Sequence, residues 1–480
     1  MRNLFCALVA IVFLASCSTL EPSYERPAAP IASRFPDGAA YKDGGKTNSL
    51  PAVEIGWRDF LRDPRLQRLV EIALQNNRDL RVVALNVRQV QAQYRIQRSA
   101  SLPSVGGFAG ESASRIPGNT PAATRTYSTG VSAAWEIDFF GRLRSLSDAA
   151  LEQYFATQDA RRAAQILLIS HVADQYLTML SQDEQLAVTR QTLATAGASY
   201  NIVKLQFEVG TGTELALRQA QSVVEQANVN LAAQTRARAQ AENALVLLLG
   251  QALPADLPPV IRLGAQHILA DIPAGLPSDL LQFRPDILQA EALLRSENAN
   301  IGAARAAFFP SISLTCSFGS AGAALGGLFG AGSLAWTFLP SITVPIFEGG
   351  ALQANLDVAR IRKDIGIAQY EKAIQTAFRE VADGLAARGT YDDQLAAQER
   401  YTATQQRSLE LAQFRYRNGV DGYLNVLTAQ TGLYDAQQAL VTTRLQRLTN
   451  LVDLYRTLGG GRIERTGDQP RAADTSISGG

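Results

Sequence analysis

Side chains that could carry out chemistry are few in this chain and lie far apart. The 480 residues include only two histidines, His171 and His267, and three cysteines, Cys6, Cys17 and Cys316. No group of His, Cys or acidic residues has the spacing of metal ligands. Neither a nucleophile-elbow motif, Gly-x-Ser-x-Gly, nor a Walker-type phosphate loop occurs. The sequence therefore predicts that the protein is not an enzyme and has no catalytic residue, metal or cofactor.

The N-terminus predicts export from the cytoplasm. A short basic start, Met1–Asn3, precedes an apolar run, Leu4–Ala15, that is too short to span a bilayer as a helix. Such a run behind a positive charge is typical of a secretory signal. We therefore expect residues 1–16 to be a signal peptide.

One cysteine lies where lipidation is expected. Leu14-Ala15-Ser16-Cys17 resembles the lipobox of bacterial lipoproteins, in which the peptide is cut before the cysteine and the thiol is lipidated. A plain signal with an incidental cysteine is the alternative. Ser18, and not Asp, follows the cysteine. The resemblance to lipoprotein sorting therefore implies a lipid anchor, including palmitate, in the outer membrane, with residues 17–56 as a strapping segment.

Composition excludes several classes of protein. The formal net charge is +1, so the chain lacks the strong overall positive charge that attracts nucleic acid. An exported chain with Cys316 as its one remaining cysteine has no internal disulfide. No later apolar run is long enough for a transmembrane helix. If the chain crosses a membrane, it must therefore do so as a closed β-barrel, because lipid offers no partners to backbone groups.

Four stretches alternate apolar and polar residues with the period of a β-strand: about 104–114, 126–139, 311–320 and 333–347. One face of these stretches carries large apolar residues, including Tyr127, Trp135, Phe318, Trp336 and Phe338, and Cys316 falls in this set. We expect that face to contact outer-membrane lipid. The opposite face is predicted to line a water-filled barrel lumen with Ser128, Ser132, Glu136, Asp138, Ser313, Thr315, Ser317 and Thr337.

The chain also contains one unit twice. Pro103-Ser104 recurs as Pro310-Ser311 at an offset of 207, and Leu249-Gly250 recurs as Leu458-Gly459 at an offset of 209. Each unit is predicted to contain a helix, two strands and a long helical hairpin. The expected parts are a first repeat (57–250, hairpin about 142–249), a linker or equatorial segment (251–278), a second repeat (279–461, hairpin about 352–458) and a disordered tail (462–480).

Four strands cannot close a membrane barrel, for which about eight is the smallest number in a single chain. A wide lumen favours three chains with twelve strands in total. The predicted fold class is mainly α with a membrane β-barrel: a trimeric, 12-stranded barrel plus an α-helical coiled-coil periplasmic tunnel. An ordinary soluble helical bundle is the alternative, against which the helix lengths and the strand pairs argue.

Several motifs together make the chain similar to one family. They are the lipobox, the duplicated halves and four segments: 135–142 (WEIDFFGR), 284–286 (RPD), 303–310 (AARAAFFP) and 458–461 (LGGG). The chain resembles the outer-membrane factor (TolC-like) family, in its OprM-like efflux lipoprotein branch. The resemblance implies a homotrimer that serves as the outer-membrane channel of a tripartite efflux pump. It also implies a periplasmic adaptor (membrane fusion) protein and an inner-membrane pump of the resistance-nodulation-division (RND) type as partners.

The implied function is that of a passive exit duct for drugs and other small amphiphiles. Protein secretion or metal-ion efflux by the same fold stays open, although the mature chain has only Met179 and two histidines to suit a metal path. A periplasmic adaptor lipoprotein is a further alternative. An adaptor should, however, have one hairpin and flanking β-domains, whereas this chain has two hairpins.

The resemblance implies a periplasmic gate just after the hairpin turns. The positions that carry aspartate in the family correspond to Ala216, Asn425 and Thr428, none of which is acidic here. Nearby charged residues are possible salt-bridge partners, or simply a solvated tip: Glu214, Arg218, Arg417 and Asp421. The sequence therefore predicts a gate that closes less tightly and attracts cations less than in relatives with aspartate.

Overall fold

The computed structural model describes residues 19–41, 50–115, 123–270, 272–273 and 275–468. The chain divides into two compact units, each built from three segments of sequence. Unit 1 comprises residues 1–29, 85–159 and 288–372, and unit 2 comprises residues 30–84, 160–287 and 373–480. In the described part of the chain, no helix combines the length and the apolar character that a membrane crossing requires.

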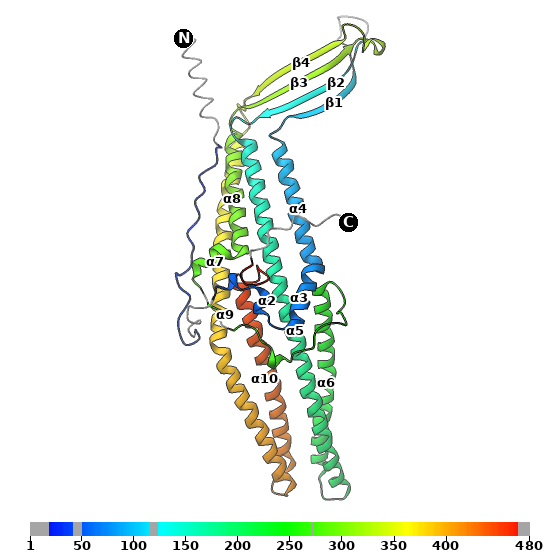
Figure 1. The fold of residues 1–480 in the computed structure, drawn as a ribbon, viewed down its shortest axis with the longest axis vertical. Helices are drawn as coiled ribbons and strands as arrows, with labels where there is room; N and C mark the ends of the chain where they lie inside the picture. The colour runs from blue at the N-terminus through cyan, green and yellow to red at the C-terminus, as the bar shows by residue number, and fades with distance from the viewer. Residues whose placement is uncertain (1–18, 42–49, 116–122, 271, 274, 469–480) are drawn as a thin grey trace. The chain divides into compact units, whose positions relative to one another are not determined.

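Unit 1 contains a four-stranded antiparallel sheet in the order β1-β2-β3-β4 (Figure 1). Its strands are β1 (Ser104–Ser114), β2 (Thr124–Ile137), β3 (Ser311–Gly322) and β4 (Leu334–Thr343). The last stretch was expected to continue to residue 347 but ends earlier as a strand. Pro345 has no N–H to donate, and Gly349 and Gly350 adopt positive φ angles of 57° and 88°. The strands β1 and β4 form the two edges of the sheet within one chain.

The register of the sheet sorts its side chains into two faces, because directly paired residues point to the same side. Ser132 pairs with Ser317, which in turn pairs with Thr337, and the two hydroxyl oxygens Ser317 Oγ and Thr337 Oγ1 lie 2.6 Å apart. On the other face, Val131 pairs with Phe318. Phe318 in turn pairs with Trp336. The sheet thus has one face with a polar row and one with large apolar side chains.

Two glycines of the sheet approach the neighbouring strand too closely for any side chain. A Cβ atom on Gly319 would lie 2.1 Å from the carbonyl oxygen of Thr129. A Cβ atom on Gly130 would lie 2.5 Å from the carbonyl oxygen of Phe318. These two glycines pair directly across β2 and β3. The close contact between the two strands therefore depends on both glycines.

The junction between β2 and the following helix, α5 (Arg142–Glu208), is fixed by two acidic residues. Asp138 accepts hydrogen bonds from the backbone N–H groups of Leu143 (3.0 Å) and Arg144 (2.8 Å), and so caps the helix. Both carboxylate oxygens of Glu136 accept hydrogen bonds from Arg142 Nη2, Oε1 at 2.8 Å and Oε2 at 2.9 Å. Asp138 was expected to line the lumen, but it lies just beyond the end of β2 and caps the N-terminus of α5.

Unit 1 also holds the N-terminal segment against α8 (Pro285–Ala306). The carbonyl oxygen of Leu20 accepts from Arg305 Nη1 (3.1 Å), and that of Pro22 accepts from Asn298 Nδ2 (2.8 Å). Further along, Arg26 forms an ion pair with the buried carboxylate of Glu291. Three contacts spaced along one helix fix this segment as an extended strap.

Unit 2 is helical. It contains α2 (Trp57–Phe60), α3 (Pro64–Asn76), α6 (Glu214–Leu249), α7 (Pro277–Phe283) and α10 (Tyr423–Thr457), with short 3-10 turns at Ala52–Glu54 and Leu263–Ala265. The helices α4 (Arg78–Ser99), α5, α8 and α9 (Ala351–Arg417) have residues in both units. At a rise of 1.5 Å per residue, the 67-residue helices α5 and α9 are each on the order of 100 Å long.

The helix expected before the strands of the first repeat is interrupted at Asn77, which separates α3 from α4. This residue has an extended backbone, with φ −60° and ψ 129°. Its Oδ1 accepts from the N–H of Leu80 (2.8 Å), and its Nδ2 donates to the carbonyl oxygen of Leu248 (2.9 Å). Asn77 therefore caps α4 and ties the break to the end of α6.

The expectation of a disordered tail from residue 462 does not hold for residues 462–468. The N–H of Trp57 donates to the carbonyl oxygen of Ile463, and that of Arg58 donates to the carbonyl oxygen of Glu464, both at 3.1 Å. The backbone of Arg465 also lies so close to Gly56 that a Cβ there would be only 2.4 Å away. The remainder of the tail, 469–480, lies outside the described residues.

Candidate functional site at the hairpin tips

The two predicted hairpins are both present in unit 2, as α5 with α6 and α9 with α10 (Figure 1). Each turn begins with a glycine at positive φ: Gly210 at 77° and Gly419 at 71°. Such angles favour glycine, which has no Cβ to clash. Thr213 then caps α6, since its side-chain oxygen accepts from the N–H of Ala216 at 3.2 Å.

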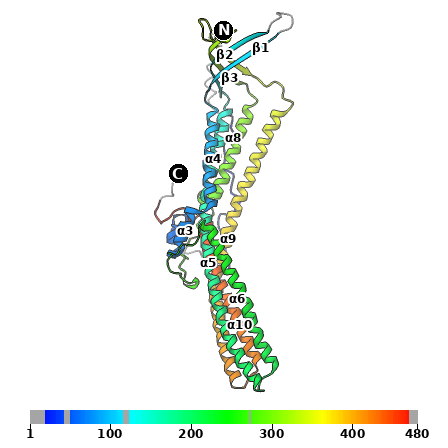
Figure 2. The same cartoon turned by 90° about the vertical axis from the view of Figure 1, so that its right-hand side faces the viewer.

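The two hairpins run in the same direction toward their turns (Figure 1 and Figure 2). Near the tips they pack against each other through a shared apolar cluster. Its buried members are Val203, Ala220, Leu409, Tyr423, Val426, Ala429 and Leu433. The alanines allow a close approach of the helices, and the larger side chains fill the space between them. Tyr416 OH also donates to Gln206 Oε1 (2.6 Å) between the hairpins. The chain therefore joins its two tips into one packed body.

Ala216 takes part in this packing. It is half-buried and contacts the cluster from α6. Its methyl group has no capacity for a hydrogen bond or a charge. Its place at a gate stays a prediction, and any contribution there would be steric rather than polar.

Asn425 and Thr428 are exposed on the first turns of α10. Thr428 Oγ1 donates to the carbonyl oxygen of Leu424 within its own helix (2.9 Å). Asn425 lies beside Asp421 and takes part in its hydrogen bonding. Both side chains are thus polar, uncharged and accessible. Residues that narrow a pore by hydrogen bonds would need these properties.

The charged residues of the tips form two separate pairs. Glu214 and Arg218 approach to 3.4 Å along α6, and about two thirds of each side chain is exposed. Asp421 pairs with Arg415, with Nε to Oδ2 at 2.6 Å and Nη2 to Oδ1 at 3.0 Å. The hydrogen bond from Arg415 lowers the pKa of the Asp421 carboxyl. Arg417, which sequence reasoning named in place of Arg415, is exposed at the end of α9.

A polar network higher in the hairpins was not predicted from the sequence. The hydroxyl of Tyr434 lies 3.1 Å from Thr189 Oγ1 and accepts from Asn230 Nδ2 (3.1 Å) and Gln234 Nε2 (3.4 Å). Gln438 Nε2 donates to Thr189 Oγ1 at 3.4 Å. These contacts join α10 to both helices of the other hairpin. No sequence pattern marks this network, because Gln and Thr are spread widely over all four helices.

The other predicted site residues fall in unit 1 or outside the described residues. The register places six of the expected lumen residues on one face of the sheet: Ser128, Ser132, Glu136, Ser313, Thr315 and Thr337. Phe108 and Leu339 share that face, so it is mixed rather than purely polar. Cys17, the expected lipidation site, lies outside the described residues. Within the described ranges, no three His, Cys, Asp or Glu side chains are grouped to hold a metal ion.

Comparison with known proteins shows which proteins this chain is similar to. The family model described as outer membrane efflux protein matches residues 69–251 and 276–460. The antibiotic efflux pump outer membrane protein ArpC of Pseudomonas putida is 47% identical over 479 residues, which cover 98% of each chain. The solvent efflux pump outer membrane protein SrpC of Pseudomonas putida is 48% identical over 459 residues, 95% of this chain and 97% of SrpC.

The solved structures include a channel of the same architecture. The open state of the MtrE outer membrane channel of Neisseria gonorrhoeae aligns with a TM-score of 0.86 and 40% identity. The alignment covers 94% of this chain and all of the MtrE chain. The likeness therefore spans nearly the whole chain.

Proposed function

The chain belongs to the outer membrane efflux protein family, and on that premise we propose that it is the passive exit duct of a tripartite pump for drugs and other small amphiphiles. The single observation that carries this proposal is the match of nearly the whole chain to outer-membrane efflux channels. The family predicted from the sequence motifs, the place in the outer membrane and the role as an efflux channel component are confirmed.

We propose that three copies share one barrel, to which each contributes β1–β4. Within one chain the sheet ends in two edges, β1 and β4, whose outward backbone groups need partners in lipid. Pairing β4 of one copy with β1 of the next would satisfy both edges at once. The polar row through Ser132, Ser317 and Thr337 would then face water inside the barrel.

The proposed substrates follow from the relatives. ArpC is named for antibiotic efflux and SrpC for solvent efflux, which favours small amphiphiles as the cargo of this chain. The proposed partners are a periplasmic adaptor that contacts the hairpin tips and an RND-type pump in the inner membrane. Metal ions and secreted proteins are the alternative cargoes. The proposal includes no catalytic step, since the passage itself is the function.

Lipidation at Cys17 is a separate part of the proposal. The strap that follows it binds α8 at successive points, which would hold a nearby anchor in a fixed place. In C17A, incorporation of labelled palmitate should be lost. A palmitate signal that persists in C17A would contradict this assignment.

The efflux role can be tested in cells from which the gene has been deleted. Deletion should raise the accumulation of a fluorescent amphiphile, and the wild-type gene should restore its export. Sensitivity to divalent metals and the amount of secreted protein should stay unchanged. If deletion alters metal sensitivity or secretion while amphiphile accumulation is unaffected, the proposed substrate class is wrong.

A further inference from the structure

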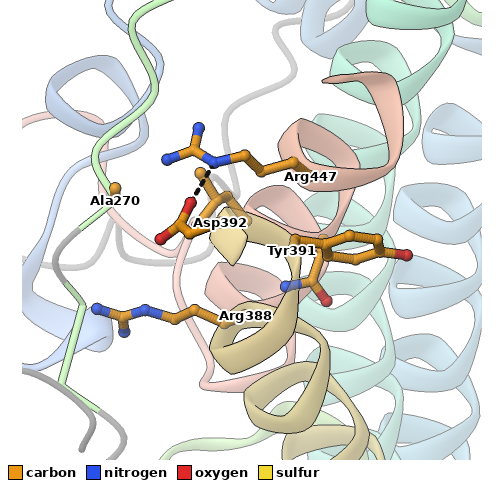
Figure 3. A pocket seen from close by; sticks show the side chains of 7 residues that line it. Ala270, Arg388, Tyr391, Asp392 and Arg447 are labelled. Carbon is orange, nitrogen blue, oxygen red and sulfur yellow. Dashed lines mark hydrogen bonds and ion pairs between the residues drawn. The ribbon is translucent and has the colours of Figure 1, made fainter. Parts of the chain in front are cut away.

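The charged side chains around a small cavity between α9 and α10 already have partners within the chain (Figure 3). Arg447 Nε donates to Asp392 Oδ1 at 2.6 Å. Arg388 Nη1 donates to the carbonyl oxygen of Ile272, also at 2.6 Å. The arrangement of charges there therefore gives no indication of a bound ligand.

The N-terminal strap of unit 1 lies on buried oxygen atoms that have no such partners. Within the described part of the chain, Glu21 Oε1 of the strap, Ser145 Oγ of α5 and Asn298 Oδ1 of α8 are buried without a hydrogen-bond partner. Ser145 is fully buried, and Asn298 is 4% exposed. A buried polar atom without a partner destabilises the folded state. Three such oxygens along one strap therefore indicate a ligand that supplies positive charge.

A glycine of α8 brings two of these oxygen-bearing side chains together. A Cβ atom on Gly302 would lie 2.4 Å from Glu21 Cγ and 2.6 Å from Ser145 Oγ. Both side chains therefore meet beside the backbone of Gly302. At the offset of 207, Arg95 stands in the place of this glycine in the first repeat. The room for Glu21 is thus particular to the second repeat, against which the strap lies.

The third oxygen belongs to the same face of α8. Asn298 lies one turn before the glycine, so the two positions are neighbours on the helix surface. Asn298 Nδ2 donates to the carbonyl oxygen of Pro22 at 2.8 Å. Arg305 Nη1 donates to the carbonyl oxygen of Leu20 at 3.1 Å. Glu21 is therefore held between two fixed strap residues, and the Asn298 amide is fixed through its nitrogen.

Two carboxylates supply negative charge at this place. Asp148 lies one turn after Ser145 on α5 and is exposed. Burial raises the pKa of the Glu21 carboxyl, the Ser145 hydroxyl lowers it, and the charge of Asp148 raises it. Arg144 acts on Asp148, but its Nε also lies 3.5 Å from Asp138 Oδ2, so its charge is shared. A cation between Glu21 and Asp148 would remove their repulsion.

We infer that Glu21, Ser145, Asn298 and Asp148 form a binding site for a hard divalent cation, Ca²⁺ in preference to Mg²⁺. Carboxylate and amide oxygens are typical Ca²⁺ ligands, and a serine hydroxyl offers a further lone pair. Ca²⁺ accepts irregular geometry, whereas Mg²⁺ demands a nearly regular octahedron. Water would complete the shell, so we expect a dissociation constant of about 10⁻⁴ to 10⁻³ M.

Such a site differs from the expectation of no metal, which was based on clusters of His, Cys and acidic residues. Here only two acids take part, and the other ligands are an amide and a hydroxyl. The ligands come from the strap, α5 and α8. A bound cation would therefore tie the strap to two helices at once, whatever the cargo of the channel.

Calcium titration of the full-length mature protein in detergent tests this site. After treatment with EDTA, thermal unfolding is followed in CaCl₂, MgCl₂ and NaCl at one ionic strength. The midpoint should rise with the Ca²⁺ concentration. In E21Q and S145A the apparent dissociation constant should rise by about tenfold. In E25Q, which changes an exposed acid of the same strap, it should stay within about twofold of wild type.

Hydrogen exchange of the wild type supplies a second measurement, which stays informative if E21Q or S145A does not fold. Ca²⁺ should slow exchange at residues 19–26 of the strap and leave residues 418–420 unchanged. If Ca²⁺ alters neither the unfolding midpoint nor the exchange of the strap, Glu21 holds only a proton and the inference is overturned. Equal losses in E21Q and E25Q would overturn it as well, since they would reflect general screening. A Mg²⁺ response equal to that of Ca²⁺ would overturn the stated preference.

Discussion

Arg415 and Asp421 form a two-point ion pair across the turn between α9 and α10, with donor–acceptor distances of 2.6 and 3.0 Å. The pair spans the residues that reverse the chain, so it fixes the shape of the second tip. The other hairpin has no matching pair in the described residues of its turn: its Glu214 and Arg218 lie along one helix. The two tips are therefore held differently.

We predict that D421N loosens the second turn without unfolding the hairpin. The N–H of Val420 donates to the carbonyl oxygen of Arg415 (2.9 Å), so this bond and the ion pair close the same turn. Hydrogen exchange at residues 418–420 should become faster in D421N, whereas exchange at residues 210–212 of the other turn should not change. Unchanged exchange at both turns would show that the pair is not what orders the tip.

The same pair predicts a pH effect at the tip. Arg415 lowers the pKa of Asp421 below its ordinary value of 3.8. A carboxyl with a depressed pKa in the folded state contributes stability above pH 3.8 and loses it as the pH falls through the lower value. The protection factor of residues 418–420, which corrects the exchange rate for its intrinsic pH dependence, should therefore stay constant from pH 7 to pH 5 and fall only below about pH 4. In D421N the fall of the protection factor at low pH should be absent.

Ion selectivity should respond to acids placed at the exposed polar positions of α10. N425D together with T428D would place carboxylates at the positions for which the family resemblance implies aspartate. We expect a more cation-selective channel than wild type, as measured by reversal potential in a salt gradient across a planar bilayer. A216D is the matched comparison: since Ala216 packs in the apolar cluster, this change should destabilise the tip instead of altering selectivity. Wild-type selectivity as strong as that of the double variant would contradict the predicted weak gate.

The close strand approach predicts that the sheet tolerates side chains at some glycines and not at others. G319V would place its side chain against the carbonyl oxygen of Thr129, whereas Gly110 has open space around its Cβ position. The amount of folded protein in the outer-membrane fraction should fall severely in G319V and stay near wild type in G110A. Equal amounts of the two variants would mean that β2 and β3 can move apart at little cost.

A partly buried acid in unit 2, Asp174, predicts a second pH dependence, of opposite sign. Burial raises the pKa of Asp174 from 3.8 to about 7, and the charge of Asp453 adds to the shift. Arg456 and a 3.5 Å hydrogen bond from Ser170 act against it. The folded state therefore binds this proton more tightly than the unfolded state, and stability is lost as the pH rises from about 4 to about 7. D174N should raise the unfolding midpoint at pH 8 and much less at pH 5. An equal rise at both pH values would show that charge is not the cause.

The sequence predicts the strands and hairpins well because their signals are local. The alternation around Trp135 and Trp336 has the period of a strand, and long runs free of proline favour helices α5 and α9. The break at Asn77 was missed because the apolar pattern continues through it, and only the contact with Leu248 shows why the chain bends there. The early end of β4 could have been expected from Pro345.

The candidate site was less predictable, because it depends on how separate helices meet. The resemblance to the family indicated the right turns, but the partner of Asp421 is set by turn geometry, so Arg417 was named and Arg415 was not. Ala216 was named by alignment alone, and its packing against the apolar cluster of the tips becomes visible only when both hairpins are placed. The network around Tyr434 likewise depends on the register between hairpins, which no local pattern encodes.

The central claim, that the protein is a water-filled passage, is tested most directly by single-channel recording of the purified protein in planar bilayers. The account predicts discrete conductance steps for the wild type, with a weak preference for cations, and larger or more frequent steps for D421N. If neither the wild type nor D421N conducts, although both are folded and inserted in the bilayer, the claim is wrong.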